Sequence, residues 1–402
     1  MKIMKRVYSF LLSVLSMVLC VGCIYDFSPE ELDIDMENFE FIVIDGDITP
    51  GDYTYVKIYK SVPLESEDRM VYISNANVWV ENSAGERWIG TLNYDYSSGQ
   101  YIGLEYVINT TGLPLDGEYK LCADISGRGI YESELMPVMV TPDIDSITFS
   151  IGADSTELYI EATTHFDSDE PLYCKWDYDS DWEFKTYHRP ELSYSNVMGM
   201  HYLTPEAKQQ MYYCWGKESS TDVYIASSEN LSENLLYKQR LNTIHYKDNK
   251  LNSLYSTLVT QRRLSKNGYI YWNNIKKSSS QMGGLFSPQP SEVRGNITNL
   301  SNPKEKVLGF ISVATTVSKR LYITRMEAGI YDPNPDGICN PVLYGINFWS
   351  NVVGAGLLPI DYLTNESGMP DFNNAFWTTG KCVDCRLEGS KQRPSYWPND
   401  HF

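Results

Sequence analysis

Short runs in which apolar and polar residues alternate follow one another along the chain from about residue 39. In the first part they are separated by Asp-Gly, Ser-Gly, Ala-Gly and Arg-Gly turn signals at spacings of roughly 8 to 12 residues, a pattern typical of a β-sandwich. We predict strands at residues 39–46, 53–59, 76–80, 88–92, 100–102, 119–125 and 131–136. Residues 38–140 are therefore predicted to form an N-terminal β-sandwich.

A second β-rich region begins at residue 141, because Pro142 follows the last of these strands. Its clearest element is residues 172–183, where apolar and charged side chains alternate with a period of two. The apolar set is Leu172, Cys174, Trp176, Tyr178 and Trp182, and the charged set is Lys175, Asp177, Asp179, Asp181 and Glu183. Because a strand turns successive side chains to opposite faces, we predict a long antiparallel strand with one face in water.

Two helices are predicted as insertions within residues 141–402. Thr204 is a good N-cap with Pro205 at the first helical position, and Ser265 is a candidate cap for a second helix. Residues beyond about 329 are predicted to be a loop-rich tail held by its cysteines. The chain is therefore predicted to be mainly β, with tandem β-sandwich domains and short helical insertions in the second.

The first 22 residues have the plan of a cleaved targeting segment. A basic start precedes an apolar run that ends near Leu19, and the small Gly22 stands directly before Cys23. A lipoprotein signal peptidase needs a small residue at the cut and a following thiol to carry the lipid. Residues 1–22 therefore predict a lipoprotein signal peptide and Cys23 the lipidated residue, a durable anchor if it carries more than one acyl chain. An ordinary secretory signal with a chance cysteine is the alternative.

Residues 23–37 are predicted to be an acidic tether, with five carboxylates by Asp35. This segment resembles the acidic signals that carry lipoproteins to the outer face of the outer membrane in the Bacteroidota. A solvated linker would have much the same composition, so both interpretations stay open.

Charge narrows the classes of partner. The 402 residues include 33 Lys and Arg and 52 Asp and Glu, a formal charge of −19, and removing residues 1–22 takes away three basic side chains and no acid to leave −22. Such an acidic surface repels phosphate backbones and anionic lipids, which argues against a nucleic-acid binder or a polybasic membrane binder. No later stretch approaches the roughly 18 apolar residues of a spanning helix.

Six cysteines remain after Cys20 and Cys23 are set aside: Cys122, Cys174, Cys214, Cys339, Cys382 and Cys385. An even number in an oxidising compartment predicts up to three disulfides, and the spacing leaves all of the roughly 15 pairings open. Cys382 and Cys385 have the spacing of a redox or zinc motif. Neither a second such pair nor a thioredoxin-like context accompanies them, so structural disulfides are the favoured interpretation.

A weak calcium loop is the one candidate metal site. Asp332, Asn334 and Asp336 place oxygen ligands at alternate positions before the turn residue Gly337, although Leu343 stands where a closing carboxylate belongs. A plain Pro-Asp-Gly turn is the alternative. The acidic run from Asp177 to Asp181 lacks the turn glycine, so we interpret it as a solvated strand face. No other cofactor is predicted.

The sequence contains no HExxH, GxSxG, GxxxxGK[ST] or GxGxxG motif. A glycosidase needs only two well-placed carboxylates, so the motif search leaves that class open. Flat aromatic side chains are frequent, with 31 Tyr and 9 Trp. Most are expected in strands and cores, and those left exposed are candidates for binding sugars, peptides or a protein partner.

Two resemblances add to this interpretation. Residues 74–80, with Ala84-Gly85 and Gly99-Gln100-Tyr101, resemble small immunoglobulin-like domains found beside carboxypeptidases and transporters, which implies an immunoglobulin-like sandwich. Several motifs in order resemble the Bacteroidota lipoprotein family known as domain of unknown function 4249: Tyr213-Cys214-Trp215, Gln261-Arg262-Arg263, Gly295-Asn296-Ile297, Val307-Leu308-Gly309-Phe310, Lys319-Arg320, Cys382-Val383-Asp384-Cys385-Arg386 and Tyr396-Trp397-Pro398. That resemblance implies a surface-exposed outer-membrane lipoprotein, in a family typically encoded beside a TonB-dependent transporter, with no catalytic residues to carry over.

Three functions follow as hypotheses. The first is a non-catalytic accessory or ligand-binding lipoprotein that faces the cell exterior and partners a TonB-dependent transporter in nutrient uptake. The second is a surface hydrolase acting on glycans or peptides. The third is a structural or adhesion lipoprotein.

Overall fold

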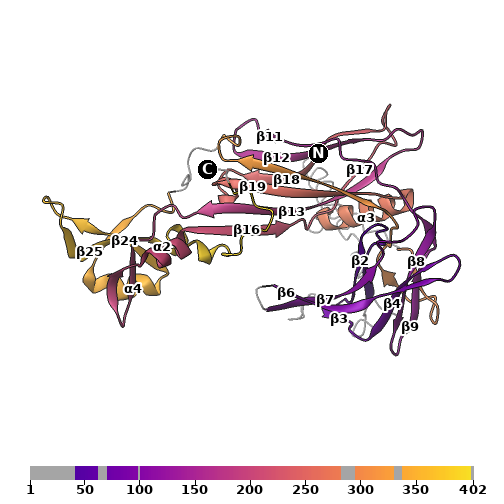
Figure 1. Cartoon of the computed structure of the whole chain (residues 1–402), viewed down its shortest axis with the longest axis horizontal. Coiled ribbons are helices and arrows are strands. Elements are labelled where there is room, and N and C mark those ends of the chain that lie inside the picture. The colour runs from indigo at the N-terminus through magenta and orange to yellow at the C-terminus, as the bar shows by residue number, and fades with distance from the viewer. Residues whose placement is uncertain (1–40, 62–69, 98–99, 282–294, 330–336, 400–402) are drawn as a thin grey trace, which may run out of the picture. The chain divides into compact units, whose positions relative to one another are not determined.

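The computed structural model describes residues 41–61, 70–97, 100–281, 295–329 and 337–399. It confirms the mainly β prediction (Figure 1). Two pairs of sheets enclose separate cores, and a smaller group of strands packs around a third. The predicted immunoglobulin-like character of the first pair stays a prediction.

The first sandwich consists of two sheets. One has the order β21-β1-β2-β7-β6 with β3 beside β2, and its strands are β1 Ile42–Gly46, β2 Tyr53–Lys60, β3 Val71–Tyr72, β6 Thr91–Ser97, β7 Gln100–Asn109 and β21 Val307–Leu308. The other has the order β20-β9-β8-β4-β5 with β10 beside β8, and its strands are β4 Ala76–Asn82, β5 Arg87–Ile89, β8 Glu118–Ile125, β9 Gly129–Ser133, β10 Met136–Pro137 and β20 Ile297–Asn299. Ile58 and Tyr106 from one sheet share a core with Val80 and Leu121 from the other.

Each sheet of this sandwich contains a strand from much later in the chain than the predicted range of residues 38–140. β21 pairs in parallel with β1, and β20 pairs with β9. Gly295 and Gly309 cross so closely that a Cβ on Gly295 would lie 1.6 Å from the Gly309 carbonyl oxygen. The Asn296 amide then accepts from the Ile311 N–H at 2.8 Å and donates to the Ile311 carbonyl at 2.9 Å. These contacts explain the Gly295-Asn296 pair: the close crossing leaves no room for a side chain at Gly295, and the Asn296 amide pairs with the Ile311 backbone.

The second sandwich also has two sheets. One has the order β11-β12-β18, with strands β11 Ser146–Ile151, β12 Glu157–His165 and β18 Leu235–His245. The other has the order β16-β13-β19-β22 with β17 beside β13, and consists of β13 Tyr173–Lys185, β16 Tyr213–Ser219, β17 Tyr224–Ser227, β19 Leu254–Arg263 and β22 Thr316–Thr324. The alternation predicted for β13 is present: Trp176 and Tyr178 are buried while Asp177 and Asp179 are exposed. Glu183 departs from it, because the carboxylate is buried.

Both predicted helices form. Helix α2, Pro205–Tyr212, begins after Thr204, whose hydroxyl accepts from the Ala207 N–H. Helix α3, Lys266–Gln281, begins after Ser265, whose hydroxyl accepts from the Gly268 N–H at 3.1 Å. Short 3₁₀ turns complete the helical segments: η2 Asn249–Leu251, η3 Ile346–Phe348, η4 Gly380–Cys382 and η5 Cys385–Leu387.

The prediction of a loop-rich segment beyond residue 329 is wrong for residues 342–379. Strands β23 Val342–Gly345, β24 Leu357–Thr364 and β25 Pro370–Thr379 form a sheet there, beside helix α4 Trp349–Gly354 and the hairpin of β14 Leu192–Ser195 and β15 Gly199–Tyr202. Trp349 and Trp377 are the large rings of its core. Pro, Asp and Asn are common in β25 and disfavour strands, so the local sequence hides a strand that its partners stabilise.

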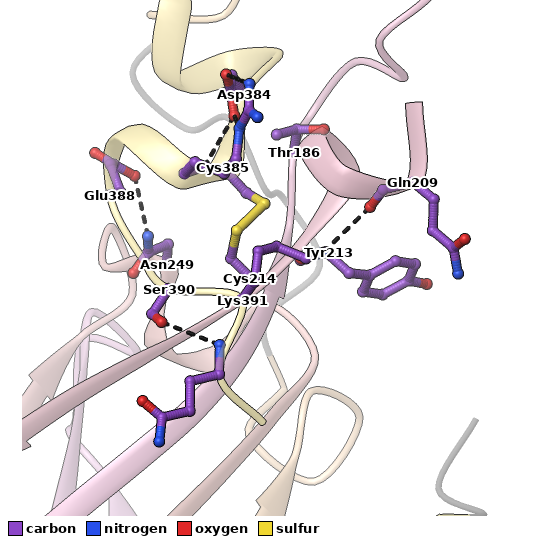
Figure 2. Close-up of a disulfide and its surroundings, with 12 residues drawn as sticks. Thr186, Gln209, Tyr213, Cys214, Asn249, Asp384, Cys385, Glu388, Ser390 and Lys391 are labelled. Atoms are coloured by element: carbon purple, nitrogen blue, oxygen red, sulfur yellow. Dashed lines mark hydrogen bonds and ion pairs between the residues drawn. A yellow bond between two sulfur atoms is a disulfide. The ribbon is translucent and has the colours of Figure 1, made fainter. Parts of the chain in front are cut away.

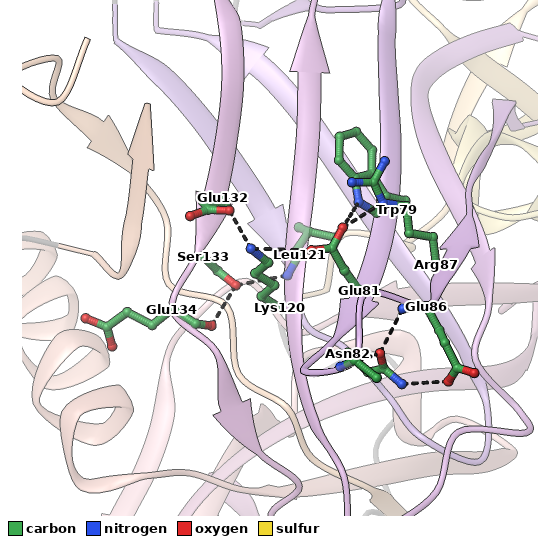
Figure 3. Close-up of polar contacts among 11 residues, drawn as sticks. Trp79, Glu81, Asn82, Glu86, Arg87, Lys120, Leu121, Glu132, Ser133 and Glu134 are labelled. Carbon is green, nitrogen blue, oxygen red and sulfur yellow. Dashed lines mark hydrogen bonds and ion pairs between the residues drawn. The ribbon is translucent and has the colours of Figure 1, made fainter. Parts of the chain in front are cut away.

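Glu81 collects three donors on the outer face of the first sandwich (Figure 3). It accepts from Trp79 Nε1 at 3.1 Å and from Arg87 Nε at 2.6 Å, and Lys120 Nζ lies 3.5 Å away. Burial by itself would raise the pKa of Glu81, but these hydrogen bonds and the charges of Lys120 and Arg87 outweigh it and lower the pKa. The folded state therefore favours the ionised carboxylate.

A group whose pKa is lowered by folding stabilises the protein above its unfolded pKa and loses that effect as the pH falls through its folded value. We expect Glu81→Gln to lower the free energy of unfolding by about 1 kcal/mol at pH 7, and the difference from the parent to shrink as the pH falls through the folded pKa of Glu81, which lies below the usual value of a glutamate. Urea unfolding at several pH values measures this. Glu118→Gln, an exposed acid of β8, is the control, and a difference that persists at acid pH would contradict the assignment.

Gln261 connects the two sheets of the second sandwich. Its side chain, fully buried in β19, accepts from Trp176 Nε1 at 2.8 Å and donates to the Pro142 carbonyl at 2.8 Å and to the Thr164 hydroxyl at 3.2 Å. Trp176 lies in β13 of the same sheet, Thr164 lies in β12 of the opposite sheet, and Pro142 lies in the link from the first sandwich. One amide thus satisfies polar groups from three segments.

Gln261→Leu would leave the Trp176 N–H and the Pro142 carbonyl buried without this partner. Since an unsatisfied buried polar group costs about 1–3 kcal/mol, we expect a loss of roughly 2–4 kcal/mol in the free energy of unfolding. Chemical denaturation measures it, with Gln239→Ala as the control because that amide donates to a carbonyl at the partly exposed surface. A change below about 1 kcal/mol would show that the network contributes little.

Candidate functional site

One face of the sheet β16-β13-β19-β22 gathers aromatic and charged side chains. In the pairing of β13 with β16, Glu183 is opposite Trp215 and Lys185 is opposite Tyr213. Directly opposed residues, and residues two apart on one strand, share a face. Tyr213, Trp215, Glu183 and Lys185 therefore project from the same side, while Cys214 between them points into the core, where it is fully buried.

The C-terminal segment, residues 386–399, closes over this face. A disulfide joins Cys214 of β16 to Cys385 of η5 (Figure 2). Trp215 and Ser390 then exchange two backbone hydrogen bonds of 2.8 Å, each N–H donating to the other residue's carbonyl. β16 ends its sheet, so the segment covers part of an edge that would otherwise present unpaired backbone groups.

Two consecutive rings of this segment bind the acids of β13. Trp397 Nε1 donates to Glu183 Oε2 at 3.1 Å, and both side chains are buried. The Tyr396 hydroxyl donates to Asp181, and the Arg320 guanidinium lies 3.7 Å from the centre of the Tyr396 ring. Burial, followed by the hydrogen bond to Asp181, raises the pKa of Tyr396 to about 12. The predicted solvent face of β13 is therefore partly covered.

Beside these contacts a cavity of about 360 Å³ remains open. Its walls combine three aromatic rings with carboxylate, amide and cationic side chains: Tyr213, Trp215, Trp397, Glu183, Gln209, Asn399, Lys391 and Arg393. We call it the aromatic pocket. Its volume falls within the range of about 300–1,000 Å³ usual for small-molecule sites.

The two cations of the aromatic pocket already donate to protein oxygens. Lys391 Nζ binds the carbonyls of Gln209 and Tyr213. Arg393 Nη2 binds the carbonyls of Trp397 and Pro398 and the side chain of Asn399 at 2.7–3.2 Å. Burial and the charge of Arg386 lower the pKa of Lys391. Both cations thus hold the segment in place.

A second cavity, of about 310 Å³, lies next to the disulfide Cys339–Cys382. Lys185, Lys247, Lys250 and Lys381 line it, together with Asp248 and Glu388. Lys250 pairs with Glu218 at 2.6 Å and Lys381 pairs with Glu388 at 3.2 Å. The positive charge of the lysines is thus partly neutralised. This cavity therefore supports a ligand site less strongly than the aromatic pocket does.

The structure resolves the cysteine pairing that the sequence left open. Cys214–Cys385 and Cys339–Cys382 are disulfides, whereas the candidates Cys122 and Cys174 are buried thiols. The prediction of disulfides is wrong for those two, because Cys122 belongs to β8 of the first sandwich and Cys174 to β13 of the second. Burial raises the pKa of both thiols, that of Cys122 to about 12.

The remaining site residues predicted from the sequence fall into two groups, those outside the described residues and the acids of β13. Cys23 and the loop residues Asp332, Asn334 and Asp336 lie outside the described residues, so lipidation and the calcium loop stay predictions. The acids of β13 do not form a cation site: Asp177 pairs with Lys175, Asp179 accepts from Ser219, and Asp181 accepts from Tyr396. Within the described ranges, no group of three or more His, Cys, Asp or Glu side chains is placed to hold a metal.

The sequence does not predict the aromatic pocket. Tyr213, Trp215 and Trp397 stand out only as parts of family motifs, and Glu183 is predicted only as a solvent-facing strand residue. The usable signal was the pair of aromatic residues on either side of Cys214, which places both rings on the face opposite the cysteine. Nothing local indicates that Trp397 returns to Glu183, more than 200 positions earlier.

A family model described as Domain of unknown function (DUF4249) matches residues 29–320, more than half of the chain. The chain belongs to the DUF4249 family. The match includes β13 and β16 of the aromatic pocket, and the C-terminal segment that completes the pocket lies beyond it. No curated protein matches the chain.

Among the described residues of this DUF4249 protein, no helix has both the length and the apolar character needed to cross a membrane.

We expect the double substitution Cys214→Ser with Cys385→Ser to lower the free energy of unfolding by about 2–4 kcal/mol, because the disulfide closes a loop of 171 residues. It should also expose residues 386–399 to proteases. Denaturation without reductant and limited proteolysis with mass spectrometry measure both effects. Cys122→Ala, which removes a buried thiol but no cross-link, is the control. Unchanged proteolysis would mean that the other contacts suffice to hold the segment.

Proposed function

We propose that this DUF4249 protein is a lipid-anchored, non-catalytic binding protein of the outer-membrane surface, which delivers a ligand to a TonB-dependent transporter. The aromatic pocket is the observation that carries the binding role. It offers rings, amides and a buried carboxylate in a cavity of about 360 Å³, held by a disulfide and a pair of backbone hydrogen bonds. A cavity whose walls are fixed in this way loses little conformational entropy when a ligand enters.

The location and the partner rest on the sequence. Gly22-Cys23 after a basic and apolar segment supports lipidation, and the acidic residues 23–37 support export to the cell exterior. The motifs shared with Bacteroidota lipoproteins of the DUF4249 family support the transporter as partner.

Hydrolysis at the same pocket has less support. Most glycosidases use two carboxylates about 5 to 9.5 Å apart, and Glu183 is the one acid among the described residues that line the aromatic pocket. That carboxylate already accepts a hydrogen bond from Trp397. A purely structural or adhesive role would leave a pocket of this composition without a use.

Affinity purification of the tagged full-length protein from detergent-solubilised outer membranes of its own cells tests the proposal. We expect a TonB-dependent transporter to co-purify and the protein to incorporate labelled palmitate. Cys23→Ala should abolish labelling and release the protein from the membrane fraction, because the thioether is the proposed attachment. Cys20→Ala is the matched control. Recovery in the inner-membrane fraction, or purification without any transporter, would refute the proposal.

A further inference from the structure

We propose that the aromatic pocket binds a neutral pyranose unit, at the end of a glycan or within a short oligosaccharide. This assignment rests on the proposed binding function and specifies its ligand class. A pyranose has apolar faces of C–H groups and a rim of hydroxyls. The pocket offers the complementary surfaces, since rings bury apolar faces and planar carboxylate and amide groups accept and donate at a hydroxyl rim.

The ring surfaces come from two places in the chain. Tyr213 and Trp215 stand side by side on β16, and Trp397 comes from the C-terminal segment. The Trp215 indole N–H is buried and makes no hydrogen bond within the described residues. An unsatisfied buried donor in a native structure calls for an explanation, and an ordered water or a ligand oxygen would provide the acceptor.

The polar groups surround the rings. Gln209 on α2 and Asn399 in the C-terminal segment are exposed amides at the pocket, and each carries a donor and an acceptor group. The Glu183 carboxylate, which accepts from the Trp397 N–H, adds a negative wall to the pocket. This set suits vicinal hydroxyls, which donate and accept at once.

The charges favour a neutral ligand over an ionic one. Lys391 and Arg393 are the groups that would attract an anion, but both donate to backbone carbonyls of the pocket wall. The buried carboxylate of Glu183 lies in the same pocket and repels a negative charge. A cation would have to compete with the two fixed positive groups that line the same cavity.

The edge of the sheet disfavours an extended peptide. A peptide that adds a strand needs free backbone groups on β16, and at Trp215 these are engaged by Ser390 at 2.8 Å in both directions. The volume, at the small end of the usual range, suits one or two sugar rings.

Titration of the full mature protein in a sugar-free detergent tests the assignment, followed by calorimetry and tryptophan fluorescence. The probes are neutral trisaccharides of glucose, mannose, galactose and xylose, with trigalacturonate and trialanine as the charged and peptide comparisons. We expect at least one neutral trisaccharide to bind, and Trp215→Ala to weaken that binding at least tenfold. Tyr237→Ala, an exposed ring on β18, should change it less than twofold.

Gln209→Ala, at an exposed helical position that does not threaten folding, provides a second test and should weaken binding several-fold. If trigalacturonate or trialanine binds and no neutral sugar does, the ligand class is wrong while the binding function stands. If none of the probes binds, the pyranose assignment fails, and the co-purification experiment decides the proposed function separately. Neutral sugar binding that survives both pocket substitutions would place the sugar elsewhere and overturn the assignment.

Discussion

The buried amide of Gln261 is the contact on which the described chain most depends. It satisfies an indole on its own sheet, a hydroxyl on the facing sheet and a carbonyl in the link between the sandwiches. The next residue faces the other way along the strand. There Arg262 forms an ion pair with Asp47 of the first sandwich and donates to the Thr49 hydroxyl at 3.3 Å. Two neighbouring residues of β19 thus connect the sandwiches: Gln261 binds groups inside the second sandwich, and Arg262 binds residues of the first.

The return of the chain strengthens this connection. After α3 the backbone crosses itself at Gly295 and Gly309, adds a strand to each sheet of the first sandwich, and then continues into β22 beside β19. The Tyr271 ring of α3 packs on Phe310 in the returning segment, with ring centres 5.4 Å apart. Neither sandwich has its full set of strands without chain from both sides of α3.

The C-terminal segment also joins distant parts of the chain, at the β16 edge of the sheet β16-β13-β19-β22. It pairs with Trp215, is cross-linked at Cys214, and turns a strand face rich in acids into a cavity with aromatic walls. A carboxylate such as Glu183 is tolerated in a buried position because the Trp397 indole hydrogen-bonds it. The pocket therefore arises from covering a polar face, whereas the two sandwich cores arise from burying apolar ones.

Local patterns predicted much of this architecture. The caps at Thr204 and Ser265, the alternation in β13 up to Trp182, and most strands of the first sandwich depend on neighbours in sequence, and they formed as predicted. The prediction of one strand at residues 88–92 is wrong, because the chain passes there from β5 in one sheet to β6 in the other. The strand β25 was not predicted because its Pro, Asp and Asn residues disfavour strands, and its partners β23 and β24 stabilise it. The late strands β20 and β21 carry motif residues whose purpose shows only beside β9 and β1.

The sequence by itself determined the β class, the strong negative charge and the number of thiols, because these follow from composition and from contacts a few residues apart. Only the tertiary structure decided which four cysteines pair, which strands complete the first sandwich, and that Trp397 meets Glu183. Those outcomes join residues from about 40 to more than 200 positions apart. A periodic pattern specifies which way a side chain points, and only the folded chain brings it opposite its partner.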